Sequence, residues 1–84
     1  MDESFEGRLA AITGRTKAEI SWTLNELAYW NYIAEYKPEE RRNLGASVEH
    51  SVQEQVGVEQ EVKDAAVLVA KTVYLPLRYR NFAA

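Results

Sequence analysis

The stretch from Thr16 to Tyr36 has hydrophobic positions at helical spacing and predicts a helix of about 20 residues. At about 100° per residue, its aliphatic and small residues fall on one side: Ile20, Leu24, Leu27, Ala28 and Ala34, with Asn31 among them. Roughly opposite lies a mostly aromatic face: Trp22, Tyr29, Tyr32, Ile33 and Tyr36. Because a surface helix needs only one apolar face, the second one requires its own explanation.

The aromatic face of this helix has two interpretations. If both faces are core, the helix lies sandwiched inside the fold. If the aromatic face contacts another chain, its tyrosines and tryptophan suit that role, because one end of each ring is buried while the other finds a hydrogen bond. We favour the second interpretation, since the rest of the chain is too short to cover both faces easily. The five aromatic-face residues are therefore the candidate interface with a second copy or with a different protein.

A short helix is predicted ahead of the two-faced one, over residues 4 to 13. Three of its residues share an apolar face: Phe5, Leu9 and Ile12. Ser4 or Asp2 is suited to cap its N-terminus. We expect this short helix to pack on the two-faced helix.

Two signals mark the junction between these helices. Gly14 suits the C-terminal end of the first helix, because a residue without a side chain readily adopts the left-handed conformation found there. Thr16 and Glu19 have the T-x-x-E spacing of a capping box, in which the hydroxyl accepts from the backbone N–H of Glu19 and the carboxylate reaches back. The two-faced helix is therefore predicted to begin at Thr16.

From Pro38 to about Tyr74 the hydrophobic pattern stays helical and changes phase at Gly57. No Asn, Asp, Ser or Pro lies near Gly57 to build a loop, so we favour one long or kinked helix over a compact bundle with a sharp break there. Such a helix is roughly 55 Å long, whereas a compact domain of this size has a radius of gyration near 12 Å. A single chain cannot cover it, so we expect a homo-oligomer.

Residues 75 to 84 are predicted as an extended C-terminal tail. Hydrophobic and other residues alternate from Val73 to Tyr79, which is the period of a strand, and Pro76 restricts such a strand to an edge or an extended arm. The tail either covers the bundle, or packs across a neighbouring subunit, or places Arg78 and Arg80 on a phosphate backbone.

The composition narrows the class of protein without naming a function. Eighty-four residues make a single domain with a modest core, and the absence of cysteine removes disulfides and thiolate metal sites. A net charge of −3 argues against a generally basic nucleic-acid binder. We see neither a secretion signal nor an apolar run long enough to span a bilayer, so we expect a cytoplasmic protein or one within an assembled particle.

Residues 8 to 20, RLAAITGRTKAEI, resemble the helix–turn–helix part of ribbon-helix-helix repressors and antitoxins. Six residues carry the resemblance: Leu9, Gly14, Arg15, Thr16, Lys17 and Ile20. The DNA-reading strand of that family precedes its first helix, and almost no room for it exists here, so no base-contacting residue is carried over. The resemblance implies a dimeric DNA-binding regulator of plasmid or phage type, with Arg15, Thr16 and Lys17 at phosphate-contacting positions.

Catalytic chemistry has little support in the sequence. His50 is the one histidine, and Glu54 lies one turn away on the predicted helix, so these two make at most a weak surface metal site. No acid–base–nucleophile constellation or phosphate-binding glycine loop is present. We therefore predict an all-α, self-associating protein that works by protein–protein contact as an inhibitor, an adaptor or an assembly subunit, with no catalytic, cofactor or metal residues. The DNA-binding regulator is the alternative.

Overall fold

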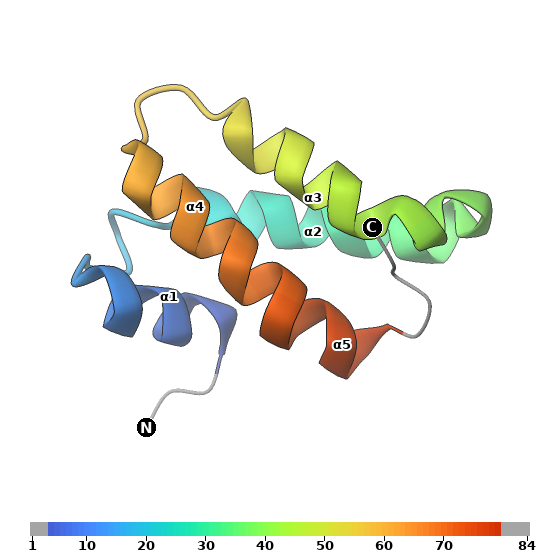
Figure 1. The fold of residues 1–84 in the computed structure, drawn as a ribbon, viewed down its shortest axis with the longest axis horizontal. Coiled ribbons are helices and arrows are strands. Elements are labelled where there is room, and N and C mark those ends of the chain that lie inside the picture. Colours follow the sequence, from blue (N-terminus) through green and yellow to red (C-terminus); the bar gives the residue numbers. More distant parts are fainter. Residues whose placement is uncertain (1–3, 80–84) are drawn as a thin grey trace.

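Helices account for most of the chain that the computed structural model describes, which is residues 4–79 (Figure 1). In chain order these elements are α1 (Phe5–Thr13), α2 (Trp22–Tyr36), the 3₁₀ helix η1 (Pro38–Asn43), α3 (Leu44–Gln53), α4 (Gln60–Val69), the π-helical segment η2 (Ala70–Tyr74) and α5 (Leu75–Arg78). No strand occurs among the described residues. The prediction of an all-α fold is confirmed.

The ends of α1 follow the local sequence signals. The Ser4 hydroxyl accepts a hydrogen bond from the backbone N–H of Gly7 at 3.1 Å. At the other end, Gly14 has a φ of 72° and donates its N–H to the carbonyl of Ala10. Phe5 and Leu9 of this helix are buried, but Ile12 is 60% exposed. Ile12 lies in the last turn of α1 and is not buried with Phe5 and Leu9, although the sequence placed all three on one apolar face.

The predicted capping box is present, although the helix behind it begins later than expected. The N–H of Thr16 donates to the Glu19 carboxylate at 3.0 Å, and the N–H of Glu19 donates to the Thr16 hydroxyl at 3.3 Å. These hydrogen bonds from Thr16 lower the pKa of the Glu19 carboxyl, because they favour its charged form. The bonds that follow join residues three apart, so the chain forms turns before α2 begins at Trp22.

Helix α2 buries a different side from the one predicted. Its buried residues are Thr23, Glu26, Trp30, Ile33 and Ala34. Trp30 belonged to neither predicted face and has 0% exposure, whereas Leu24, from the predicted aliphatic face, is 52% exposed. Ile33, predicted on the aromatic face, is 2% exposed. The buried side of α2 therefore lies between the two predicted faces. Trp30, the largest buried side chain of this helix, is at the centre of that buried side.

A loop at residues 54–59 separates α3 from α4, so the prediction of one long helix through Gly57 is wrong and the alternative of a sharp break is right. Gly57 has a φ of 78°, a conformation that glycine adopts without a loop-forming neighbour. Side chains also join the two helices across the loop: Gln60 Nε2 donates to Gln53 Oε1 at 2.7 Å, and Lys63 Nζ donates to the Gln53 carbonyl at 3.1 Å. The argument for an oligomer from helix length therefore no longer applies.

The C-terminal part continues α4 as helix rather than as an extended tail. Residues 70–74 form wider, π-helical turns, and the N–H of Leu75 donates to the carbonyl of Ala70. This widening comes just before Pro76, which lacks an N–H for the regular helical bond. The extended tail predicted to begin at residue 75 is wrong for Leu75–Arg78, because these residues form a helix from which Leu75 packs in the core. Residues 80–84 of the predicted tail lie outside the described residues.

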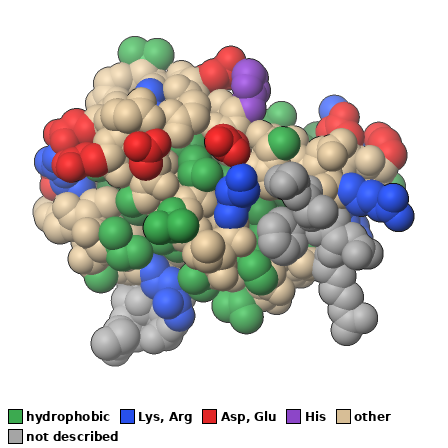
Figure 2. Space-filling model, viewed as in Figure 1, with side chains coloured by type: hydrophobic (Ala, Val, Ile, Leu, Met, Phe, Trp, Pro, Cys, Tyr) green, Lys and Arg blue, Asp and Glu red, His purple; other side chains and the backbone are tan. Residues whose placement is uncertain are grey.

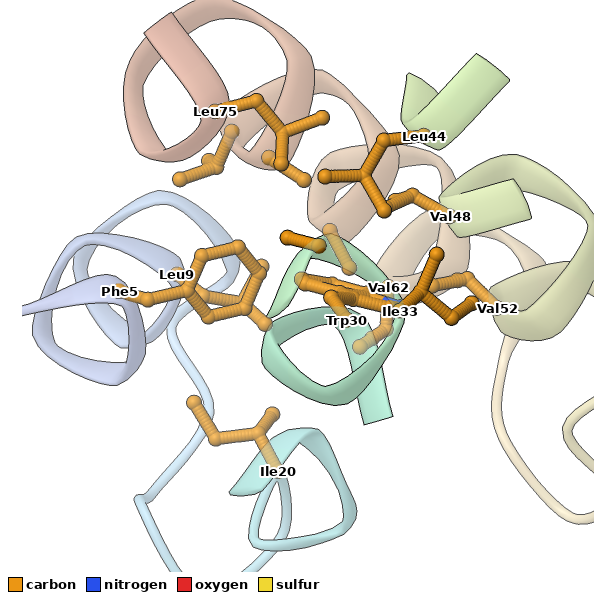
Figure 3. Close-up of a cluster of buried hydrophobic side chains, with 14 residues drawn as sticks. Phe5, Leu9, Ile20, Trp30, Ile33, Leu44, Val48, Val52, Val62 and Leu75 are labelled. Carbon is orange, nitrogen blue, oxygen red and sulfur yellow. The ribbon is translucent and has the colours of Figure 1, made fainter. Parts of the chain in front are cut away.

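The core forms where α1, α2, α3 and the α4–α5 rod meet (Figure 3). Three aromatic rings meet edge to face within it: Phe5, Trp30 and Tyr74 have centroids 5.7 to 5.8 Å apart. Aliphatic side chains from the other helices complete it, among them Leu44, Val48, Val52, Val62 and Leu75. Among the described helices, none combines the length and the apolar character that crossing a membrane requires.

Candidate functional site

The outward side of α2 carries a continuous row of exposed apolar residues. Leu24, Ala28, Tyr32 and Tyr36 are spaced by four residues, so they follow one another along the helix surface. Leu24 is 52% exposed, Tyr32 51% and Tyr36 65%, and Tyr29 beside the row is 50% exposed. The rings of Tyr32 and Tyr36 have centroids 5.2 Å apart. We call these five residues the tyrosine face.

The structure divides the predicted aromatic face into surface and interior. Tyr29, Tyr32 and Tyr36 lie together on the surface, whereas Trp22 is half-buried and Ile33 lies in the core. Two members of the tyrosine face were missed, because we placed Leu24 and Ala28 on the aliphatic face opposite the aromatic one. Their spacing of four residues from Tyr32 and Tyr36 was the signal that places them in the same row.

An acidic groove adjoins the tyrosine face between α2 and α3. Its lining residues are Glu26, Tyr29, Ser47, His50, Ser51, Glu54 and Gln55. Glu26 is only 8% exposed; its Oε1 accepts from the Gln55 amide, and its Oε2 has no hydrogen-bond partner within residues 4–79. At the surface, His50 Nε2 lies 3.2 Å from Glu54 Oε1. This groove offers two carboxylates next to Tyr29.

Metal chemistry gains no support from the His50–Glu54 pair. Both side chains are exposed, the histidine by 76% and the glutamate by 67%. Within residues 4–79, no group of three or more histidine or acidic side chains is arranged to hold a metal ion. The pair is an ordinary contact between residues four apart on a helix.

The residues predicted near phosphates are not brought together. The guanidinium of Arg15 pairs with Glu59 and lies 3.4 Å from Glu61, so a phosphate has to compete with these carboxylates. The Arg78 guanidinium lies 5.7 Å from the Tyr74 ring centroid. Lys17 is exposed on the turns before α2, and Arg80 lies outside the described residues. Figure 2 shows the Lys and Arg side chains of one face in separate places rather than in one cluster.

Comparison with known proteins does not supply a function. No family model matches the chain, and neither a curated protein nor a solved structure is significantly similar to it. The function is therefore argued from the tyrosine face and the groove beside it.

Proposed function

We propose that this protein acts by binding another protein chain through the tyrosine face of α2, and that it is not an enzyme. The observation that carries this proposal is the continuity of the exposed row from Leu24 to Tyr36. Isolated exposed apolar residues are normal on a protein surface. A contiguous apolar patch rimmed by polar residues is instead typical of an interaction site.

The residue types support the same function. Tyrosine is enriched at interfaces and at their energetic hot spots, because its ring buries a large area while its hydroxyl keeps a polar partner. Among the described residues, the other large exposed apolar side chains belong to other elements: Ile12 to α1, Val56 to the loop, Leu68 to α4 and Leu77 to α5. A protein of this kind serves as an inhibitor, an adaptor or a subunit of an assembly.

Site-specific photo-crosslinking in the source cells tests this function. A photoreactive phenylalanine analogue replaces Tyr32 in one variant and Leu68 in another. Leu68 is a matched control, because it is 58% exposed but lies on α4 rather than on the tyrosine face. We expect a discrete crosslinked band from the Tyr32 position and none from the Leu68 position. Equal crosslinking at both positions, or none at Tyr32, contradicts the proposal.

A further inference from the structure

We propose that the partner of the tyrosine face is a second copy of the chain, packed antiparallel about a two-fold axis that passes level with Trp30. This inference rests on the proposed function and specifies its partner. The axis is placed by the row itself, since residues 24 and 36 lie equally far from residue 30, as do residues 28 and 32. Two-fold symmetry then brings each residue of the row opposite the one at the mirrored position in the other copy.

The side chains of the row are complementary in size under this symmetry. Ala28 of one copy lies opposite Tyr32 of the other, so the smallest side chain of the row faces a large one. Leu24 lies opposite Tyr36 in the same way. A parallel arrangement instead places Tyr32 against Tyr32 and Ala28 against Ala28, which crowds one level of the interface and leaves another empty. Close packing therefore favours the antiparallel pair.

Charge also favours this orientation. The two-fold axis lies in the plane of the interface and runs perpendicular to the two α2 helices. Rotation about this axis therefore leaves α3 on the same side of α2 in both copies. As a result, η1 and the end of α2 from one copy lie over the acidic groove of the other. Lys37 and Arg42 are exposed there, and neither side chain has a partner among the described residues. They bring two cations toward Glu26 and Glu54.

The acidic residues of η1 limit how much this charge term contributes. Glu39 and Glu40 are also exposed, and they lie in the first turn of η1, where the positive end of the helix stabilises their negative charges.

The row of exposed residues on α2 is about 18 Å long at 1.5 Å per residue, so the interface is one helix wide. An interface this small belongs to the weak class, and we expect a dissociation constant on the order of micromolar or weaker.

The first test is the solution mass of the purified full chain by sedimentation equilibrium, up to the highest soluble concentration. We expect a reversible monomer–dimer equilibrium. The Tyr32→Glu variant should raise the dissociation constant by about 30-fold or more, as loss of a central hot spot does. The Leu68→Glu variant should leave it unchanged. Helix content and the urea unfolding midpoint of both variants show that they remain folded. A wild-type protein that stays monomeric overturns the inference.

The second test determines orientation by disulfide trapping, for which a chain without cysteine is well suited. Leu24→Cys and Tyr36→Cys chains are mixed and oxidised with oxidised glutathione. An antiparallel pair gives the mixed 24–36 disulfide, whereas a parallel pair gives 24–24 and 36–36 disulfides. Predominance of the parallel products overturns the inference.

The two proposals fail in different ways. If the photo-crosslinker at residue 32 captures a different protein while the pure chain stays monomeric, the contact function survives and the second copy is excluded as its partner. If a dimer forms that neither Tyr32→Glu nor the trapping experiment connects to α2, the inference fails and the crosslinking result decides the function separately.

Discussion

At the scale of single residues, Trp30 is the side chain on which the core depends. It is fully buried, its ring lies against Phe5 and Tyr74, and its indole Nε1 donates to the hydroxyl of Ser51 at 3.2 Å. Ser51 in turn donates to the carbonyl of Val48. The Ser51 hydroxyl thus provides the hydrogen-bond acceptor for the indole N–H of Trp30, the largest side chain in the core.

The Ser51→Ala variant should lower the free energy of unfolding by about 1–3 kcal/mol, because it leaves the indole N–H without a partner. Urea denaturation followed by circular dichroism measures this change. Ser47→Ala is the matched control, since Ser47 lies one turn away on α3 and is partly buried like Ser51. Its effect should stay within about 0.5 kcal/mol. Equal effects of the two substitutions contradict the assigned role of Ser51.

Tyr74 gives the fold a dependence on alkaline pH. Its hydroxyl donates to Asn31 Oδ1 at 3.0 Å, and burial, with a smaller contribution from Tyr79, raises the pKa of Tyr74 to about 12. The folded state therefore holds this proton more tightly than the unfolded state, in which the pKa is about 10. The resulting stability is complete below about pH 10 and is lost as pH rises through about 12.

We expect the Tyr74→Phe variant to lack a step near pH 12 in the tyrosinate absorbance titration of the folded protein. The free energy of unfolding of this variant should also fall less between about pH 10 and 12 than that of the wild type. Identical titration curves for the two proteins would show that Tyr74 does not hold its proton more tightly in the folded state.

At the scale of elements, signals confined to a few neighbouring residues were reliable. The caps of α1 at Ser4 and Gly14 and the reciprocal hydrogen bonds of Thr16 and Glu19 were predicted correctly, because each depends only on atoms within four positions. The break at Gly57 and the helical end of the chain were not, because packing against other helices decides them. For the same reason the sequence identified the exposed tyrosines but not the burial of Trp30.

The Gly57→Ala variant isolates the backbone contribution to the loop between α3 and α4. A Cβ at this position meets no atom within 4 Å, so a steric clash contributes nothing and the left-handed conformation alone opposes the change. We expect a loss of about 1–2 kcal/mol in the free energy of unfolding, measured in urea, and a smaller loss for Gly57→Asn. If residue 57 were part of a continuous α-helix, the Gly57→Ala variant would instead have a higher free energy of unfolding than the wild type, because Ala stabilises a helix relative to Gly.

At the scale of the whole molecule, the break at Gly57 changes the case for an oligomer. Two rods, η1–α3 and α4–α5, return past α2 and give a radius of gyration of 12.1 Å, as expected for one compact domain of this length. No helix is left uncovered because of its length. The case for self-association therefore depends on the tyrosine face alone, which makes that face the place to test it.

The packing of α1 has a consequence for how the chain folds as it is made. Phe5 and Tyr74 are 69 positions apart in sequence (74 − 5), yet their rings are 5.8 Å apart. A ribosome releases α1 first, long before the last helices that complete its binding site have emerged. Phe5 and Leu9 must stay exposed on the nascent chain until then, so the core closes only late in synthesis. Until that moment α1 is an apolar segment that a chaperone can hold.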